Sequence, residues 1–391
     1  EHKTAPKAPF GHPSIRTTDI KNGRIDFNSA NRVSLETYVK WTKRRRPEPG
    51  DLILAREAPV GEVGYIPEGV FPVLGQRTVL ISPDRTQVEP RYLHYLLLSP
   101  HLQNEIKVRS AGSTVSHLNM KDIRALELPE LPDLQTQHKV AAPLGALDDK
   151  IDLNSRMNET LEEMARAIFK DWFVDFGPVR AKMEGREPYL SREIWDLFPD
   201  RFDDKGLPLA WERTTLGELA ELRYGKALKA QDRKSGSIPV YGSNGLVDWH
   251  NTPLVEGPGV VIGRKGNAGA VTYVEDDFFC IDTTFFVRPL EDKWDVRFLW
   301  FLLERLDLAG LAADSAVPGL NRNIAYSAEC IKPDCEVVKC FAETVSPFLR
   351  RIARNNNENA TLASIRDQIL PKLISGAVSV DEAENYVAEA V

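Results

Sequence analysis

The feature that most constrains this chain of 391 residues is that its second half repeats the pattern of its first half. The segment 52–56 (LILAR) returns as 260–264 (VVIGR), and the segment 92–97 (YLHYLL) returns as 298–303 (FLWFLL). The matching segments keep their order at a spacing of about 200 residues, which indicates that one structural unit occurs twice. We therefore predict a pseudo-twofold tandem repeat, in which each unit is a β-rich module followed by a long helix.

Both modules contain short runs of Val, Ile, Tyr and Phe, bounded by Gly and Pro, that are typical of strands. The predicted strands are 52–55, 64–66, 78–81, 260–263, 270–274 and 284–288. Segments 90–99 and 295–305 have the periodicity of helices with one apolar face. Each module is therefore predicted to be a globular α+β domain. Residues 211–225 have no counterpart before His12, so we expect about 20 residues of the first module to precede the given sequence.

The segments that follow the modules carry two similar heptad patterns. Apolar residues and asparagines recur at alternating spacings of three and four over residues 140–168 and again over 341–369. The seam positions are Leu147, Ile151, Asn154, Asn158 and Leu161 in the first segment, and Ile352, Asn355, Asn359 and Leu362 in the second. Pro143 and Pro347 stand early in these segments and are expected to kink or restart each helix. Beyond them, each helix would run for roughly 45 Å.

Each seam is the natural partner of the other, so we predict that the two long helices form an antiparallel coiled coil. Near the middle of such a pair Asn158 would face its repeat equivalent Asn359, and a buried Asn fixes the register at a cost in stability. The alternative is two surface helices that pack on separate cores. Phe169, Trp172 and Phe173 end the first helix as an aromatic cluster, which suits either local packing or a docking patch for a larger partner.

Composition and missing motifs argue against a membrane protein and against an enzyme. The longest apolar stretches are too short to span a bilayer, and four cysteines are too few for a disulfide framework, which fits a reducing cytoplasm. The chain has no phosphate-binding loop, no dinucleotide-binding glycine motif and no His-Glu-x-x-His motif. Cys330, Cys335 and Cys340 are spaced poorly for zinc. We therefore predict a recognition scaffold with no cofactor or metal of its own.

The polar loops of both modules carry side chains that suit nucleic acid, and residues 1–129 and 213–274 are basic although the whole chain has a net charge of −7. The loop 40–46 (KWTKRRR) places five cations around one aromatic ring, and the turn 241–245 (YGSNG) could present an amide to adenine. Each feature also has an ordinary structural interpretation: a solvated loop, a plain turn, or an arginine paired with an acid. The candidate DNA-binding residues are Lys40, Lys43, Arg44, Arg45, Arg46, Arg56, Arg77, Lys226, Lys229, Tyr241, Ser243, Asn244, Arg264, Lys265 and Arg322.

The helix motifs resemble a known family. These motifs are LDDKIDLN and MNETL within 147–161, FKDWF at 169–173, NENATL at 357–362 and LPKLISG at 370–376. They are similar to the central and distal conserved regions of the specificity subunit of type I restriction-modification systems. The resemblance covers nearly the whole chain and departs at the N-terminus. It implies a first target-recognition domain (1–132, incomplete at its start), a central conserved helix (133–178), a linker (179–211), a second target-recognition domain (212–333), and a distal conserved helix with a C-terminal tail (334–391).

The resemblance also implies a function. Each target-recognition domain would read one half of a bipartite site on double-stranded DNA, while the helix pair would set the spacing and dock two methyltransferase subunits. Those subunits would use S-adenosylmethionine, and restriction subunits would add ATP- and Mg²⁺-dependent cleavage. This chain itself would be a non-catalytic cytoplasmic protein. Two alternatives remain open here: a coiled-coil adaptor that binds a protein or sugar, and the recognition half of a fused methyltransferase-nuclease.

Overall fold

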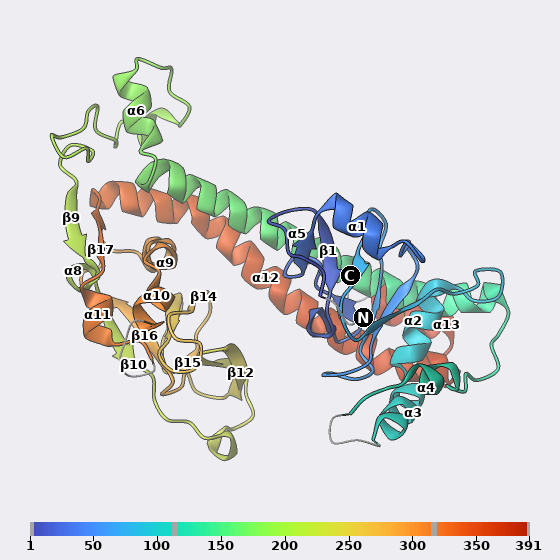
Figure 1. Cartoon of the computed structure of the whole chain (residues 1–391). Coiled ribbons are helices and arrows are strands. Elements are labelled where there is room, and N and C mark those ends of the chain that lie inside the picture. The colour runs from blue at the N-terminus through green and yellow to red at the C-terminus, as the bar shows by residue number, and fades with distance from the viewer. Residues whose placement is uncertain (1–3, 112–115, 314–318, 389–391) are drawn as a thin grey trace. The chain divides into compact units, whose positions relative to one another are not determined.

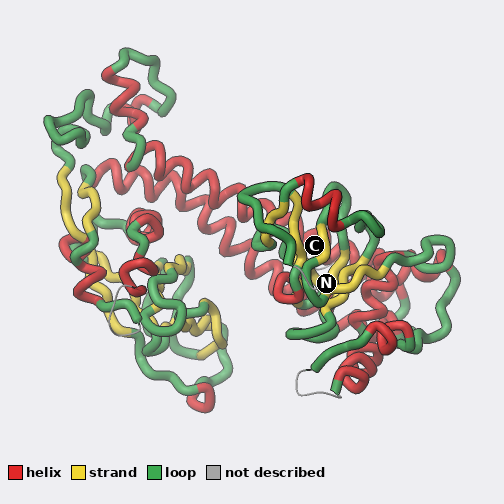
Figure 2. Tube along the Cα trace, viewed as in Figure 1, coloured by secondary structure: helices red, strands yellow, loops and turns green. Residues whose placement is uncertain are grey.

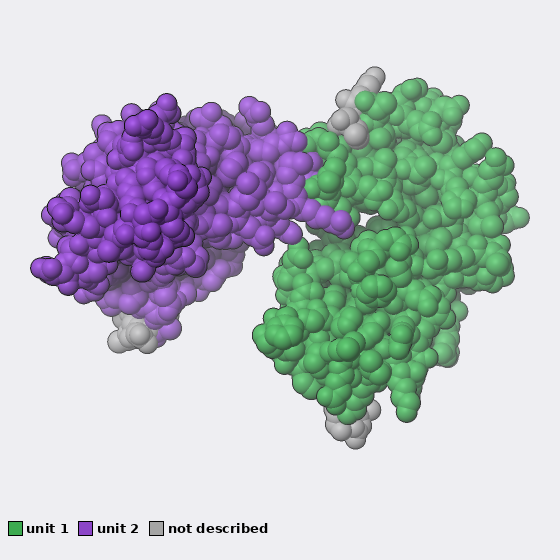
Figure 3. Space-filling model, turned by 90° about the horizontal axis from the view of Figure 1, so that it is seen from above, with its two compact units in different colours: residues 1–153, 358–391 green, residues 154–357 purple. Residues whose placement is uncertain are grey.

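The structure is a computed structural model that describes residues 4–111, 116–313 and 319–388. The chain divides into two compact units (Figure 3). Unit 1 comprises residues 1–153 and 358–391, and unit 2 comprises residues 154–357. Each unit contains one module and a part of both long helices. The beginning and the end of the chain therefore belong to the same unit.

The first module is built from two three-stranded sheets and a small hairpin (Figure 1). The central antiparallel sheet has the order β6 (Val63–Tyr65), β5 (Leu52–Ala55), β8 (Thr78–Ile81). The second sheet has the order β4 (Asn31–Val33), β1 (His12–Ile15), β7 (Val73–Leu74), with β1 and β7 parallel. The hairpin pairs β2 (Ile20–Lys21) with β3 (Arg24–Ile25). The short helices are η1 (Thr17–Asp19), α1 (Leu35–Trp41), α2 (Pro90–Leu98), α3 (Pro100–Ser110) and α4 (Met120–Arg124).

The second module repeats this arrangement with additional strands (Figure 2). Its central sheet has the order β10 (Ala220–Tyr224), β16 (Thr284–Pro289), β13 (Gly259–Gly263), β14 (Val271–Val274). Its second sheet has the order β12 (Gly245–His250), β11 (Ile238–Gly242), β15 (Phe279–Cys280), again with one parallel pair, and β9 (Glu212–Thr215) pairs with β17 (Glu329–Lys332). The short helices are α8 (Leu216–Leu219), η2 (Ala230–Asp232), α9 (Val296–Arg305), α10 (Leu308–Ala313) and α11 (Arg322–Tyr326).

The repeat is confirmed down to individual hydrogen bonds. The Leu118 amide donates to the Arg56 carbonyl at 3.0 Å, and the Leu320 amide donates to the Arg264 carbonyl at 2.9 Å. The hydroxyl of Thr78 donates to a carbonyl three residues earlier, and the hydroxyl of its counterpart in the second module, Thr284, does the same. These matching contacts show that β5 corresponds to β13 and β8 to β16.

Strands β5 and β13 are buried on both faces of their sheets. This burial explains why the sequence of each strand is a continuous apolar run. In β5, Leu52 and Leu54 pack toward α2, whereas Ile53 and Ala55 pack toward Ile15 of β1. This alternation is the ordinary period of a strand. The helix-facing residues belong to the same apolar cluster as the long helices, so the module and the helices of unit 1 share one core.

The two long helices are α5 (Leu134–Phe173) and α12 (Cys335–Ile374). Both run without interruption through their early prolines, so the prediction that Pro143 and Pro347 restart the helices is wrong. A proline removes one backbone hydrogen bond. Residues on both sides of each proline are buried, such as Val140 and Leu144 in α5 and Val345 and Leu349 in α12, so packing is available to offset this loss.

Within each unit α5 and α12 lie side by side and antiparallel (Figure 1), as predicted. In unit 1, Leu147 and Ile151 of α5 share a core with Leu362 of α12. In unit 2, Phe169 of α5 contacts Phe341 of α12, with 5.6 Å between ring centroids. Residue numbers rise along α5 while those of the contacting residues fall along α12, which defines the antiparallel direction.

Asparagines stand in the helix seam of unit 2, as predicted, but with a shifted pairing. Asn154 and Asn355 are both only 1% exposed. The side-chain oxygen of Asn158 accepts from Asn355 at 2.7 Å, and its amide donates to Asn356 at 2.9 Å. These partners lie about one helical turn before Asn359, the residue that we expected.

The aromatic cluster at the end of α5 is a core element. Phe169, Trp172 and Phe173 are 4%, 2% and 2% exposed, and they pack around Phe341 of α12 and against residues of the second module such as Phe298. The prediction that they form a docking patch is therefore wrong, and local packing is the correct interpretation. Aromatic side chains of this size at a helix end gain most from burial in a core.

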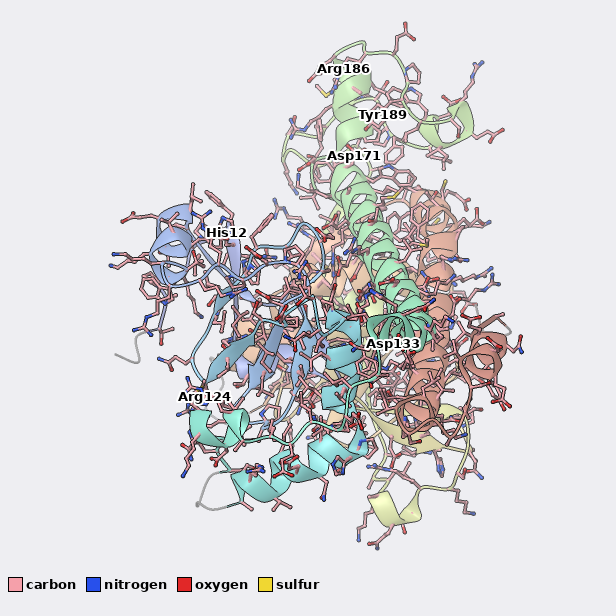
Figure 4. All side chains as sticks on the ribbon, turned by 90° about the vertical axis from the view of Figure 1, so that its right-hand side faces the viewer. His12, Arg124, Asp133, Asp171, Arg186 and Tyr189 are labelled. Carbon is pink, nitrogen blue, oxygen red and sulfur yellow. The ribbon has the colours of Figure 1, made fainter. Side chains whose placement is uncertain are left out.

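Two further segments complete the chain. After α5, α6 (Gly177–Met183) and α7 (Arg192–Trp195) lead to β9, and the hydroxyl of Tyr189 donates to Asp171 of α5 at 2.8 Å (Figure 4). The C-terminal helix α13 (Val380–Ala388) buries Ala383 in the core of unit 1. None of the helices in the described ranges is both long and apolar enough to cross a membrane.

Candidate nucleic-acid interface

The second module gathers cations and an aromatic ring where β13 ends, a place that we call corner 2. It is formed by Tyr224, Ser243, Arg264, Lys265 and Arg322. The guanidinium carbons of Arg264 and Arg322 lie 5.3 Å and 5.2 Å from the centroid of the Tyr224 ring, within the range of cation–π interaction. Tyr224 is 50% exposed, so this cationic surface is open to a ligand.

The backbone holds Arg264 in one orientation. Its Nε and Nη2 donate to the carbonyl of Asp282 at 3.2 Å and 2.6 Å, and its amide donates to the carbonyl of Thr283 at 2.9 Å. Gly263 allows this close turn, because a Cβ there would lie 2.1 Å from the carbonyl oxygen of Asn267. The side chain of Arg264 is thus held by the backbone carbonyl of Asp282. Within the described ranges it is not held by an acidic side chain, which was the structural alternative for this arginine.

The turn after β11 joins the same corner. A Cβ on Gly266 would lie 3.1 Å from Oγ of Ser243, which places this serine beside the loop that follows Arg264. Lys226 is exposed just after β10, and its amide donates to the carbonyl of Cys280. The exposed Asn244 follows Ser243 in the turn. Four short segments that are distant in the sequence therefore converge on one polar surface.

Tyr241 packs partly behind this surface. Its ring packs edge-on against Phe278, and the side chain belongs to the apolar cluster behind the sheet. Burial raises the pKa of its hydroxyl. Tyr241 is half-buried in β11, so its ring serves packing, and its role as a DNA-binding residue stays a prediction.

The matching place in the first module, at the end of β5, is corner 1, formed by Arg56, Glu57, Arg77 and His117. Nε of Arg56 donates to the carbonyl of Leu118 at 2.8 Å. The Glu57 carboxylate lies 2.8 Å from Nε of Arg77 and 2.5 Å from Nδ1 of His117. The other ring nitrogen of His117, Nε2, accepts from Nη2 of Arg56 at 2.9 Å.

The basic loop of the first module lies elsewhere. Its cations are exposed, and they are Lys40, Lys43, Arg44, Arg45 and Arg46. Arg45 contacts the hydroxyl of Ser82, which donates to Asp51 at 2.5 Å. Ser82 follows β8 and Asp51 precedes β5, so the loop is at the opposite end of these strands from corner 1. The predicted residues of the first module therefore form two separate groups.

Several functional candidates escaped the sequence analysis. Glu57 and His117 meet only because Leu118 is tied to the end of β5, and Tyr224 is reached only through the pairing of β10 with β16. Glu57 and His117 have one sequence signal, which is that each is adjacent to a residue of the repeat, Arg56 and Leu118, whereas Tyr224 has none. Lys229, which was predicted, is exposed at the start of η2. Over the described ranges, no group of three or more His, Cys, Asp or Glu residues is arranged to hold a metal.

Comparisons with known proteins agree with this architecture. The family model described as "Type I restriction modification DNA specificity domain" matches twice, at residues 7–163 and 208–362. The HindI specificity subunit of Haemophilus influenzae is 25% identical in an alignment of 376 positions, gaps included, that covers 78% of this chain and 81% of that protein. The MjaIX specificity subunit of Methanocaldococcus jannaschii is 25% identical in an alignment of 394 positions, gaps included, that covers 95% of this chain and 87% of that protein.

A solved structure shows the same fold. The crystal structure of the type I restriction-modification S subunit from M. genitalium superimposes with a TM-score of 0.55. The match covers 93% of this chain and 92% of that one at 18% sequence identity.

Proposed function

The chain belongs to the family of type I restriction-modification DNA specificity domains, and on this basis we propose that its two modules read the two halves of a bipartite DNA target. Within such a system the chain is the non-catalytic subunit that recognises DNA. The relatives named above are specificity subunits of type I restriction enzymes. The family match disfavours an adaptor for another ligand and a fragment of a fused methyltransferase-nuclease.

The observation that carries the proposal is that the two corners share a framework but differ in side chains. Glu57 of corner 1 is replaced by Lys265 of corner 2, and Arg77 is replaced by Thr283, whose carbonyl accepts from Arg264 as that of Arg77 accepts from Arg56. Base edges are read by particular donors and acceptors. Two modules with one scaffold and different polar groups therefore suit two different half-sites.

The helix pair suits a spacer role in this proposal. Asn154 and Asn355 are buried in the seam, and a buried asparagine fixes the register of a coiled coil. A fixed register would give the half-sites a defined spacing. We propose that two methyltransferase subunits bind this chain and supply S-adenosylmethionine, and that restriction subunits supply the ATP- and Mg²⁺-dependent steps.

Exchange of the second module tests the proposal. Residues 212–333 would be replaced by the equivalent module of another specificity subunit, and the bound sequences would be selected from a random duplex pool. We expect one half of the enriched motif to change while the other half is kept. Changes in both halves, or no enrichment of any sequence by the unmodified chain, would contradict it.

A further inference from the structure

Arg77 has a fixed backbone and an exposed side chain. Its carbonyl accepts from the Arg56 amide at 2.8 Å, and its φ of +63° lies in the left-handed region, which is unfavourable for a non-glycine residue. Such strain is typical of positions where a side chain must be aimed for function. The side chain is nevertheless 59% exposed, so the strain does not serve to bury it.

Glu57 aims this exposed guanidinium. Its side chain is only 15% exposed, and its carboxylate contacts Arg77 through Nε, 2.8 Å away. The Nε group carries one of the five N–H bonds of a guanidinium, so the other four, on Nη1 and Nη2, can serve a second acceptor. The contact with the Glu57 carboxylate also restricts the rotamers of the Arg77 side chain before any ligand binds. Binding then costs less conformational entropy.

The arrangement is particular to the first module. The counterparts of Glu57 and Arg77 are Lys265 and Thr283, although the strands and the backbone contacts around them are the same. A pair that served only to hold the scaffold would be needed in both modules. A pair that recognises a base of one half-site is needed only in the module that binds that half-site.

We propose that Arg77 reads a guanine of the first half-site through Nη1 and Nη2, and that Glu57 is the positioning residue that holds it for this contact. Arginine is the usual partner of guanine because its two donors match the O6 and N7 acceptors in the major groove. This inference rests on the proposed function.

The test is selection of bound sequences from a random duplex pool by the full chain and by the variants Arg77→Gln and Glu57→Gln. We expect Arg77→Gln to lose about 10- to 100-fold of the preference for guanine at one position of one half-site. Glu57→Gln should lose part of the same preference although Arg77 is intact, and Glu57→Asp should regain some of it. The preference for the second half-site should persist in every variant, which shows that the protein is folded.

The matched control is Arg85→Gln, which removes the same charge from an exposed arginine beyond the opposite end of β8. It should leave the preference at that position unchanged. An unchanged motif for Arg77→Gln, or a uniform loss of affinity for all sequences, would overturn the inference while leaving the proposed function intact. A wild-type chain that enriches no sequence would instead refute both.

Discussion

A buried ion cluster joins the first module to the helix pair and gives the sharpest stability prediction. Asp148 of α5 accepts from Nη1 of Arg366 and from the hydroxyl of Tyr95, both at 2.7 Å, and Nη1 of Arg24 lies 3.2 Å away. The Arg366 side chain is 5% exposed. Burial alone would raise the pKa of Asp148, but Arg366 and Tyr95 outweigh it and the pKa lies below its ordinary value.

We expect Asp148→Asn to lower the free energy of unfolding of unit 1 by about 2–3 kcal/mol, because Arg366 and Arg24 lose a shared buried carboxylate and Arg366 keeps only the largely exposed Asp367 as an acid partner. Urea unfolding measures the loss, and hydrogen exchange of peptides from α2 locates it in unit 1. The exchange of unit 2 should not change. A loss below about 1 kcal/mol, or one that appears in unit 2, would refute the reasoning.

The second unit supplies the matched control, because apolar residues occupy the equivalent positions. Phe301, Leu349 and Ala165 are all buried in its core. The triple variant Tyr95→Phe, Asp148→Leu, Arg366→Ala should therefore be about as stable as the wild type, since a buried ion pair can be replaced by packed apolar groups without loss. If this variant were as unstable as Asp148→Asn, the cost could not be assigned to a buried arginine that has lost a carboxylate partner.

The same cluster predicts a pH dependence. The folded pKa of Asp148 is depressed, so its contribution is complete above the unfolded pKa, about 3.9, and is lost as the pH falls through the lower folded value. The difference in unfolding free energy between the wild type and Asp148→Asn should thus shrink below about pH 4. Urea unfolding at a series of pH values measures it, and a difference that grew in acid would contradict the prediction.

Three other predictions follow from the packing and the exposed charges. Replacing Arg44–Arg46 by alanine should lower the slope of log affinity against log salt by about one for each arginine that contacts a phosphate, and an unchanged slope in a DNA titration would exclude such contacts. Phe173→Ala should cost about 3–5 kcal/mol in urea unfolding, whereas a docking role would leave stability unchanged. Asn355→Ala should cost about 1 kcal/mol in the same assay through the lost bond to Asn158, and no loss would show that this bond is not stabilising.

The repeat and the helix seams could be predicted because both are periodic and local. A buried strand such as β5 shows itself as an apolar run, and a heptad seam shows itself over many turns. The pairing of β1 with β7 could not be predicted, since these strands are about 60 residues apart and the connection is irregular. The shift of Asn158 toward Asn355 also escaped prediction, because the register depends on how both helix ends pack on the modules.

The ion clusters escaped prediction for a different reason. Arg366 occupies a seam position that the heptad pattern assigns to an apolar residue, and its partner Asp148 is more than 200 residues away in the chain. Glu57 and His117 are likewise brought together by the backbone contact of Leu118. Ion pairs between residues that are distant in the chain produce no periodic pattern in the sequence. The sequence therefore identified the basic residues but not the acidic residue that orients each of them.

The membership of residues 358–391 in unit 1 has a consequence for biosynthesis. The first module leaves the ribosome early, yet the core beneath it requires Leu362, Ile369 and Leu373, and its buried Asp148 requires Arg366. A nascent chain must therefore carry an unfinished first unit until translation has passed α12. Premature termination anywhere in the second module would release an N-terminal domain with an exposed apolar face and an Asp148 carboxylate that has lost Arg366, one of its two arginine partners, which marks the incomplete polypeptide for chaperones and proteases.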